Sequence, residues 1–151
     1  MKKVATILAA CAILSAPVML ADSESESTDI ALNRQWIDHI PDGPDDLMEV
    51  LIFVDQGYKI GLTADISEYR QHVDLVEWRL DSKDRLSFEN MQDRASHKMT
   101  FKAYECSQHG FDYCMDVKLD GKTKTFYSLD GWEVGSAEEA QAQAQLRDFD
   151  L

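Results

Sequence analysis

Residues 111–129 read FDYCMDVKLDGKTKTFYSL, and this stretch decides the fold class that the sequence predicts. In its first half every second side chain is apolar, which is the alternation of a strand with one face against a core. Asp120 and Gly121 follow directly, and Asp-Gly favours a type I′ turn because both central residues need positive φ. The stretch therefore predicts a β-hairpin in which residues 122–129 return beside the preceding strand.

Similar patterns along the chain predict further strands that follow one another. One of them, residues 47–54, is an apolar run broken only by Glu49 and rich in Val, Ile and Phe, which favours a buried strand. The other expected strands are residues 58–63, 73–80, 86–88 and 97–106, with a strand end at 132–134. About eight short strands predict a mainly β fold, an antiparallel meander that forms a small β-barrel or sandwich.

Two helices are expected to flank the meander. Thr28 and Asp29 cap a short N-terminal helix that runs through Trp36 and ends before Pro41, because the residue before proline disfavours helix. A C-terminal helix begins at residue 136, where Ser-Ala-Glu-Glu forms a capping box, and extends to about Asp148. Its apolar stripe is thin, so we expect it to lie lightly on the sheet or to fray.

The amino terminus has the composition of an export signal. Residues 1–21 begin with a methionine and two lysines and continue through an apolar run, which predicts a secretory signal peptide. Residues 22–28 alternate acidic residues with serine and predict an acidic disordered tether, which leaves residues 29–151 as a single β-rich domain. A lipoprotein is the alternative, because residues 8–11 read LAAC and resemble the motif whose cysteine, here Cys11, receives a lipid anchor.

The excess of acidic residues excludes several classes of partner. The 151 residues contain 15 Lys and Arg against 28 Asp and Glu, a formal net charge of −13. Residues 1–21 hold two of the basic residues and no acidic one, so a processed chain with 13 basic and 28 acidic residues has a net charge of −15. Nucleic acid and anionic membranes reward clustered Lys and Arg, and the sequence shows no basic patch. We expect no nucleic-acid partner, no membrane span, and a periplasmic or secreted location in a bacterium.

Two cysteines, Cys106 and Cys114, remain when the signal peptide is removed, and an even number in an oxidising compartment predicts a disulfide. The inferred hairpin places Phe101 opposite Leu119, with both cysteines on the outer face. A redox role is the alternative, but the sequence lacks the Cys-x-x-Cys spacing and βαβ context that make a thiol reactive.

Large apolar side chains on the inward faces are the candidate ligand-lining residues. Their default interpretation is a packed core, but a small barrel can keep an interior that holds one apolar ligand, and Met and aromatic side chains suit an adaptable lining. The candidates are Trp78, Phe88, Met99, Phe101, Tyr113, Met115 and Phe126. An interior filled by Trp78, Phe101 and Met115 would overturn the ligand hypothesis, whereas a void lined by them would support it.

Patterns for catalysis and metal binding are weaker. The four histidines show no zinc-ligand spacing. His39 is close to an acidic loop that offers oxygen ligands for Ca²⁺ or partners for a hydrolytic site, but the spacing is not that of an EF-hand and Pro44 interrupts it. The loop carboxylates are Asp42, Asp45 and Asp46. The sequence has neither a Gly-x-Ser-x-Gly elbow nor a phosphate-binding glycine loop, so we predict no catalytic residue, no metal and no cofactor.

The order of the expected elements resembles that of small bacterial lipocalin-like, or calycin, domains. The shared features are a helical entry with a tryptophan, a meander of short strands and a C-terminal helix, and they extend from Trp36 to Asp148 at the level of topology. The Gly-x-Trp entry motif of lipocalins is replaced by Arg34, Gln35 and Trp36, so the resemblance assigns no site residue.

These patterns favour an exported, non-enzymatic binding protein that holds a small apolar ligand in its barrel. The alternative is an acidic interaction or inhibitor module that docks a cationic protein. Such a module is similar in style to periplasmic lysozyme inhibitors, and its association weakens in salt. A hydrolase that uses His39 and its acidic neighbours is a third interpretation.

Overall fold

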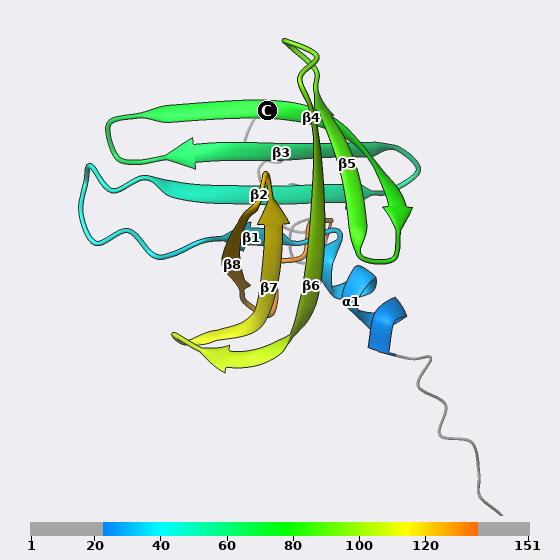
Figure 1. Ribbon diagram of the computed structural model, residues 1–151. Coiled ribbons are helices and arrows are strands. Elements are labelled where there is room, and N and C mark those ends of the chain that lie inside the picture. The colour runs from blue at the N-terminus through cyan, green and yellow to red at the C-terminus, as the bar shows by residue number, and fades with distance from the viewer. Residues whose placement is uncertain (1–22, 136–151) are drawn as a thin grey trace, which may run out of the picture.

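Eight antiparallel strands form a closed barrel in the described part of the chain, residues 23–135 of this computed structural model (Figure 1). Helix α1, Ser23–Ala31, precedes the strands and contacts β6. The strands are β1 Gln35–Ile37, β2 Met48–Asp55, β3 Lys59–Ile66, β4 Gln71–Ser82, β5 Arg85–Asn90, β6 Ser96–Gln108, β7 Phe111–Leu119 and β8 Lys122–Ser128.

Each strand pairs with the next along the chain, and the last strand returns to the first. β1 pairs with β8 through Ile37 and Tyr127, which closes the barrel. β2 and β3 cross β6 and β7 at a steep angle (Figure 1). The prediction of a mainly β, antiparallel meander is confirmed, and the meander takes the form of a barrel and not of a sandwich.

The hairpin of β7 and β8 has the expected structure. β7 has its predicted bounds, and β8 begins directly after the turn. Asp120 and Gly121 have φ values of 50° and 77°, the left-handed region that a type I′ turn requires. Other strands, such as β4 and β6, extend beyond their predicted ends because polar residues continue the ladder there without an apolar signal.

The N-terminal segment differs from its predicted structure. Helix α1 begins inside segment 22–28, which we expected to be a tether, and it ends before Trp36, through which we expected the helix to run. Asn33 adopts a left-handed φ of 54°, a conformation that terminates helices, and the chain then pairs with β2 as β1. Trp36 is fully buried and donates its indole N–H to the Ala31 carbonyl at 2.9 Å. Burial of this side chain in the barrel overrides the local helical pattern.

Helix α1 is attached to a packed part of the barrel interior. Ser27 accepts a hydrogen bond from the Ala103 amide at 2.9 Å, and Ile30 packs against the interior cluster. Phe53 and Trp78 meet edge to face, with ring centroids 6.1 Å apart. The buried members of this cluster are Ala31, Trp36, Phe53, Val76, Trp78, Leu86, Phe88, Met99, Phe101, Ala103, Met115, Val117 and Phe126.

A second apolar cluster lies outside the barrel along β1, β2 and β3. Phe53 of β2 belongs to the interior cluster, whereas Val50 and Ile52 belong to the outer one, because successive side chains of a strand point to opposite faces. The buried members of the outer cluster are Ile37, Val50, Ala64 and Phe111. β2 packs apolar side chains on both faces, which explains the run without alternation at 47–54.

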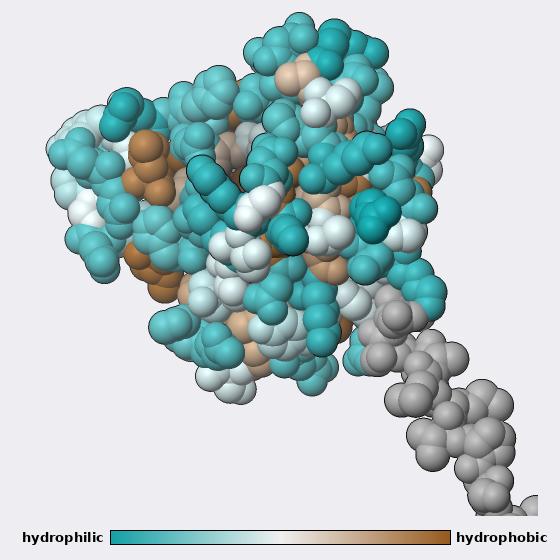
Figure 2. All heavy atoms as spheres, viewed as in Figure 1, coloured by the Kyte–Doolittle hydropathy of each residue, from teal (hydrophilic) through white to brown (hydrophobic). Residues whose placement is uncertain are grey.

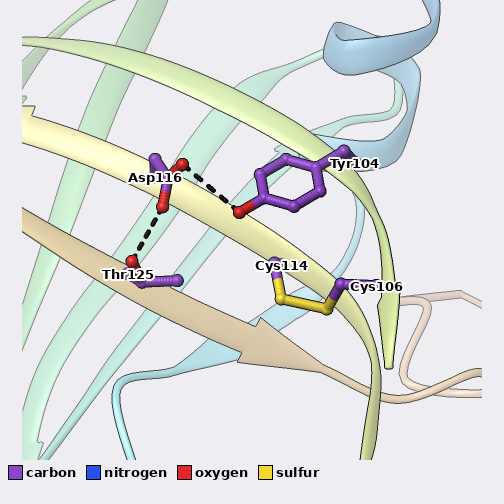
Figure 3. Close-up of a disulfide and its surroundings, with 5 residues drawn as sticks. All are labelled: Tyr104, Cys106, Cys114, Asp116 and Thr125. Carbon is purple, nitrogen blue, oxygen red and sulfur yellow. Dashed lines mark hydrogen bonds between the residues drawn. A yellow bond between two sulfur atoms is a disulfide. The ribbon is translucent and has the colours of Figure 1, made fainter. Parts of the chain in front are cut away.

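The predicted disulfide joins Cys106 of β6 to Cys114 of β7, with Cα atoms 5.7 Å apart (Figure 3). A small polar cluster lies on the same face. Asp116 accepts hydrogen bonds from the Tyr104 hydroxyl at 3.3 Å and from the Thr125 hydroxyl at 2.7 Å (Figure 3). Burial and the neighbouring Asp116 carboxylate raise the pKa of Tyr104, so its hydroxyl keeps its proton as a donor.

The register of the β6–β7 hairpin is two residues from the predicted one. Phe101 lies opposite Val117 instead of Leu119. An irregularity between Glu105 and Gln108 shifts the pairing near the turn. A bulge of this kind adds residues to one strand only, so alternation alone cannot place it.

The signal peptide predicted at residues 1–21, with Cys11, and the C-terminal helix predicted from residue 136 to Asp148 lie outside the described residues. Within residues 23–135, no helix has the length and apolar character needed to cross a membrane.

Candidate functional site

The barrel interior also holds an open cavity of about 590 Å³. Its lining comes from β2, β3, β5, β6, β7, β8 and the β7–β8 turn. The apolar lining residues of the interior cluster are Leu51, Phe88, Met99, Val117, Leu119 and Phe126, and Val50 and Ala64 of the outer cluster also border the cavity. The polar lining residues are Glu49, Thr63, His97, Asp120, Lys122 and Lys124. The cavity therefore offers an apolar surface together with a charged one.

Three of the seven candidate ligand-lining residues lie along this cavity. They are Phe88, Met99 and Phe126, one each from β5, β6 and β8. β5 and β6 are neighbours in the barrel, and β7 lies between β6 and β8.

The other four candidates do not line the cavity. Trp78, Phe101 and Met115 are buried members of the packed cluster. Tyr113 lies under the Arg34 guanidinium, whose carbon is 3.9 Å from the ring centroid. Trp78, Phe101 and Met115 thus pack into the interior together with Phe88, Met99 and Phe126, but only the last three also line the cavity, so the ligand hypothesis is restricted to that cavity.

Sequence reasoning missed the polar lining of the cavity. Lys124 lies opposite Val117 in the β7–β8 pair, two residues before Phe126, and therefore points to the same inner face. The alternation of β8 carries this signal, but a lysine does not fit the apolar lining that the sequence predicts. Glu49 was seen as a break in an apolar run, although it also faces the interior beside Leu51.

Lys124 is held by two carboxylates, Glu49 of β2 and Asp38, which directly follows β1. Its Nζ lies 2.6 Å from Glu49 Oε1 and 3.2 Å from Asp38 Oδ2. Burial alone would lower the pKa of Lys124, but these two carboxylates outweigh it and raise the pKa above its usual value. Lys124 is therefore a charged group in the wall of the cavity.

His39 lies next to this pair, at the start of the loop between β1 and β2. Its Nδ1 is 2.9 Å from Asp38 Oδ1, and its Nε2 is 3.0 Å from Asp46 Oδ2. Burial lowers the pKa of His39, but the two carboxylates outweigh this effect and raise the pKa above 6.5. The Asp42 amide and His39 both donate to Asp46 and lower its pKa.

A second histidine, His97, is part of the cavity lining. It stacks on Phe88 with ring centroids 5.2 Å apart and an interplanar angle of 27°. Its Nδ1 lies 3.7 Å from Asp120 Oδ2, at the edge of the cavity. The ring adds a flat, partly polar surface to the apolar wall.

The acidic loop is held by a hydrogen bond between its own residues. Asp46 accepts hydrogen bonds within the loop, and no group of three or more His, Cys, Asp or Glu side chains in residues 23–135 is arranged to hold a metal ion. Both ring nitrogens of His39 contact carboxylates, so neither is free to accept a proton from a substrate or water. This geometry disfavours His39 as a general base.

The structure also gathers basic side chains that are scattered in the sequence. An open hollow of about 600 Å³ on β4–β7 is lined by Arg79, Arg85, Lys98 and Lys118, together with Asp81 and Asp120. These residues alternate with inward-facing ones, and the pairing of β4 with β5, β5 with β6 and β6 with β7 brings them to one outer face. The acidic chain thus gathers four basic side chains on one face, although they are scattered along its sequence.

Comparison of the chain with models of known protein families, with curated proteins and with solved structures found no match.

Proposed function

We propose that this protein binds a small, partly apolar ligand in the open part of its barrel, without catalysing a reaction. The observation that carries the proposal is the 590 Å³ cavity between Met99, Phe126 and Lys124. Pockets for small molecules commonly have volumes of about 300–1,000 Å³, with mostly apolar walls and a few polar groups that fix orientation.

The cavity lining favours a ligand that has one apolar end and one polar end. Met99, Val117 and Phe126 offer an apolar surface, and burial of apolar ligand atoms there is the main source of affinity. Lys124 and Glu49 provide a polar region that hydrogen-bonds a head group. A small amphipathic molecule satisfies both parts better than a wholly apolar one.

Binding is tested with N-phenyl-1-naphthylamine, an apolar fluorophore that is uncharged near neutral pH. We expect saturable binding and an increase in its fluorescence on addition of the purified protein. The variant Thr63→Trp places a large side chain in the cavity wall, and we expect it to weaken binding by roughly tenfold or more, equivalent to ~1.4 kcal/mol.

Thr123→Trp is the matched control, because Thr123 is exposed on β8 and is absent from the cavity lining. We expect this variant to bind the fluorophore like the unmodified protein. Saturable binding that Thr63→Trp leaves unchanged would place the fluorophore elsewhere and contradict the proposal.

A second candidate function is docking of a cationic protein. Ile40 and Tyr69 are 63% and 68% exposed, and the Glu68 amide donates to the Pro44 carbonyl at 3.0 Å, which joins the β1–β2 loop to the β3–β4 turn. Figure 2 shows hydrophobic atoms toward the ends of β2–β4, surrounded by hydrophilic ones. Asp42 is among the exposed carboxylates of this region.

The dependence of binding on salt concentration distinguishes the two candidate functions. Docking of a basic protein such as lysozyme should weaken as salt rises, and Tyr69→Ser should reduce it, because the ring is a large exposed apolar surface. Binding of the neutral fluorophore in the cavity should depend little on salt.

We further propose that the protein is exported by a bacterium and that it resembles lipocalin-like domains in topology. The Cys106–Cys114 disulfide supports export, because such bonds persist in oxidising compartments. Fractionation of cells that express the full chain tests this: the protein should appear in the periplasm or the medium, shortened at its amino terminus.

A further inference from the structure

Each ring nitrogen of His39 lies close to a carboxylate oxygen. Nδ1 faces Asp38 Oδ1 at 2.9 Å, and Nε2 faces Asp46 Oδ2 at 3.0 Å. A neutral imidazole has one N–H and can donate to only one of these oxygens, whereas an imidazolium donates to both. The geometry therefore fits the charged form of the ring.

The charged ring fixes the loop between β1 and β2. Asp46 Oδ2 also accepts the Asp42 amide at 3.0 Å, and the Asp46 amide donates to the Gly43 carbonyl at 3.2 Å. His39 thus ties the end of β1 to a compact turn of the loop through Asp46.

The same network reaches the cavity wall. Asp38 Oδ1 accepts the Glu49 amide at 2.8 Å, and Asp38 Oδ2 accepts Lys124 Nζ at 3.2 Å. Glu49 and Lys124 both line the cavity. A continuous series of polar contacts therefore runs from Asp46 through His39 and Asp38 to the site of the proposed ligand.

We propose that the protonation state of His39 regulates release of the ligand, with the charged ring holding the β1–β2 loop to the cavity wall and the neutral ring freeing it. This inference rests on the proposed function of the cavity. When the ring loses its proton, one nitrogen presents a lone pair to a carboxylate, and that contact becomes repulsive.

Asp46 is the contact that we expect to be lost. Asp38 keeps the Glu49 amide and Lys124 as donors, whereas the remaining donor to Asp46 is the Asp42 amide of the same loop. Asp38 and Asp46 are the charged groups that face the ring, and Glu49 of β2 and Lys124 of β8 lie behind Asp38.

The experiment measures dissociation of N-phenyl-1-naphthylamine by stopped-flow fluorescence at about pH 6 and about pH 8.5, on either side of the ordinary histidine range. We expect the dissociation rate constant to rise by roughly two- to fivefold at the higher pH, the size expected for a partly exposed ion pair. His39→Gln lacks the charge and should dissociate fast at both pH values.

His72→Gln is the matched control. His72 also contacts a carboxylate, Asp74 at 3.1 Å, but this is its one ion pair within the described residues and neither side chain lines the cavity. This variant should keep the pH dependence of the unmodified protein. It also leaves His97 in place, so any contribution of that cavity histidine is common to all three proteins.

Two outcomes would overturn the inference, and they distinguish failure of the regulation from failure of the proposed function. Saturable binding whose pH dependence in His39→Gln equals that of the unmodified protein rejects the regulation but leaves the proposed function intact. Absence of binding at both pH values rejects the proposed function and the regulation together.

A second measurement avoids dependence on a variant. In NMR titrations of the unmodified protein, the amide resonances of the loop at Asp42 and Asp46 should follow the same midpoint as the His39 ring. Loop resonances that do not change with the ring would also reject the regulation.

Discussion

At the scale of single residues, Arg34 joins the start of β1 to the chain that follows β8. Its side chain is 8% exposed, and Nη1 donates to the Leu129 carbonyl at 2.8 Å. The guanidinium also pairs with Glu133 and lies over the ring of Tyr113. An arginine suits this position because its planar group can donate in several directions while it stacks on an aromatic face.

Replacement of this arginine should be costly. Arg34→Ala leaves the Leu129 carbonyl and Glu133 without their donor, and we expect a loss of roughly 2–3 kcal/mol in the free energy of unfolding. Arg94→Ala is the control, because Arg94 pairs with Glu89 but is 67% exposed, and its loss should cost about 0–1 kcal/mol. Urea denaturation of both variants measures the difference, and equal losses would contradict the role of Arg34.

His39 leads to a prediction about stability and pH. Its pKa in the folded protein is raised above 6.5, so its stabilising contribution is complete below that value and is lost as the pH rises through the folded pKa. The free energy of unfolding should therefore fall over this window in the unmodified protein and fall less in His39→Gln. Urea denaturation at a series of pH values tests this, and identical slopes would show that the contacts with Asp38 and Asp46 do not stabilise the fold.

At the scale of the elements, β3 depends on the absence of a side chain at Gly61. A Cβ there would lie 2.8 Å from the Ile52 carbonyl oxygen, 2.9 Å from Phe53 Cδ1 and 2.9 Å from Val76 Cγ2. Gly61 lies between Phe53 on β2 and Val76 on β4 in the strand register. The glycine allows these two large core side chains to approach each other over β3.

Addition of one methyl group at this position should force the strands apart. We expect Gly61→Ala to lower the free energy of unfolding by about 1–3 kcal/mol, the usual effect of overpacking. Gly43→Ala is the control, since a Cβ at Gly43 meets nothing within 4 Å and its φ is not in the left-handed region; its effect should be within about 0.5 kcal/mol. Thermal or urea unfolding of both variants measures these changes. An unchanged free energy of unfolding in Gly61→Ala would show that β3 can shift without loss of stability.

At the scale of the whole molecule, closure of the barrel depends on a short seam. β1 and β8 pair through Ile37 and Tyr127, whereas β6 and β7 pair along most of their length and carry the disulfide. Trp36 anchors β1 from the inside, so the seam is held by packing more than by its hydrogen bonds.

Hydrogen exchange should reveal this difference. We expect the amides of β1 and the facing end of β8 to exchange at least roughly tenfold faster than those in the middle of β6 and β7, an opening that is easier by ~1.4 kcal/mol. Native-state exchange followed by NMR measures both sets in one sample. Equal protection would show that the barrel opens only as a unit.

The strands and the hairpin could be predicted because their signals are local. Alternation along residues 111–119 and the Asp120-Gly121 turn depend on backbone geometry that each strand carries by itself. Helix α1 was misplaced because the burial of Trp36, which decides where the helix ends, depends on strands that follow much later in the chain.

The candidate site was predicted only in part for the same reason. Inward-facing residues follow from alternation, so Phe88, Met99 and Phe126 were found, but alternation cannot tell a packed interior from a hollow one. That distinction depends on how side chains from opposite walls fill the space between them.

The sequence by itself determined the strand faces, the tight β7–β8 turn and the pairing of Cys106 with Cys114, because each depends on residues close together in the chain. Only the tertiary structure decided where the cavity lies and how its charges meet. Asp38 and Lys124 are 86 residues apart, and closure of the barrel brings them within 3.2 Å. Their contact arises because β1 returns to β8, a pairing between the two ends of the meander that no local pattern encodes.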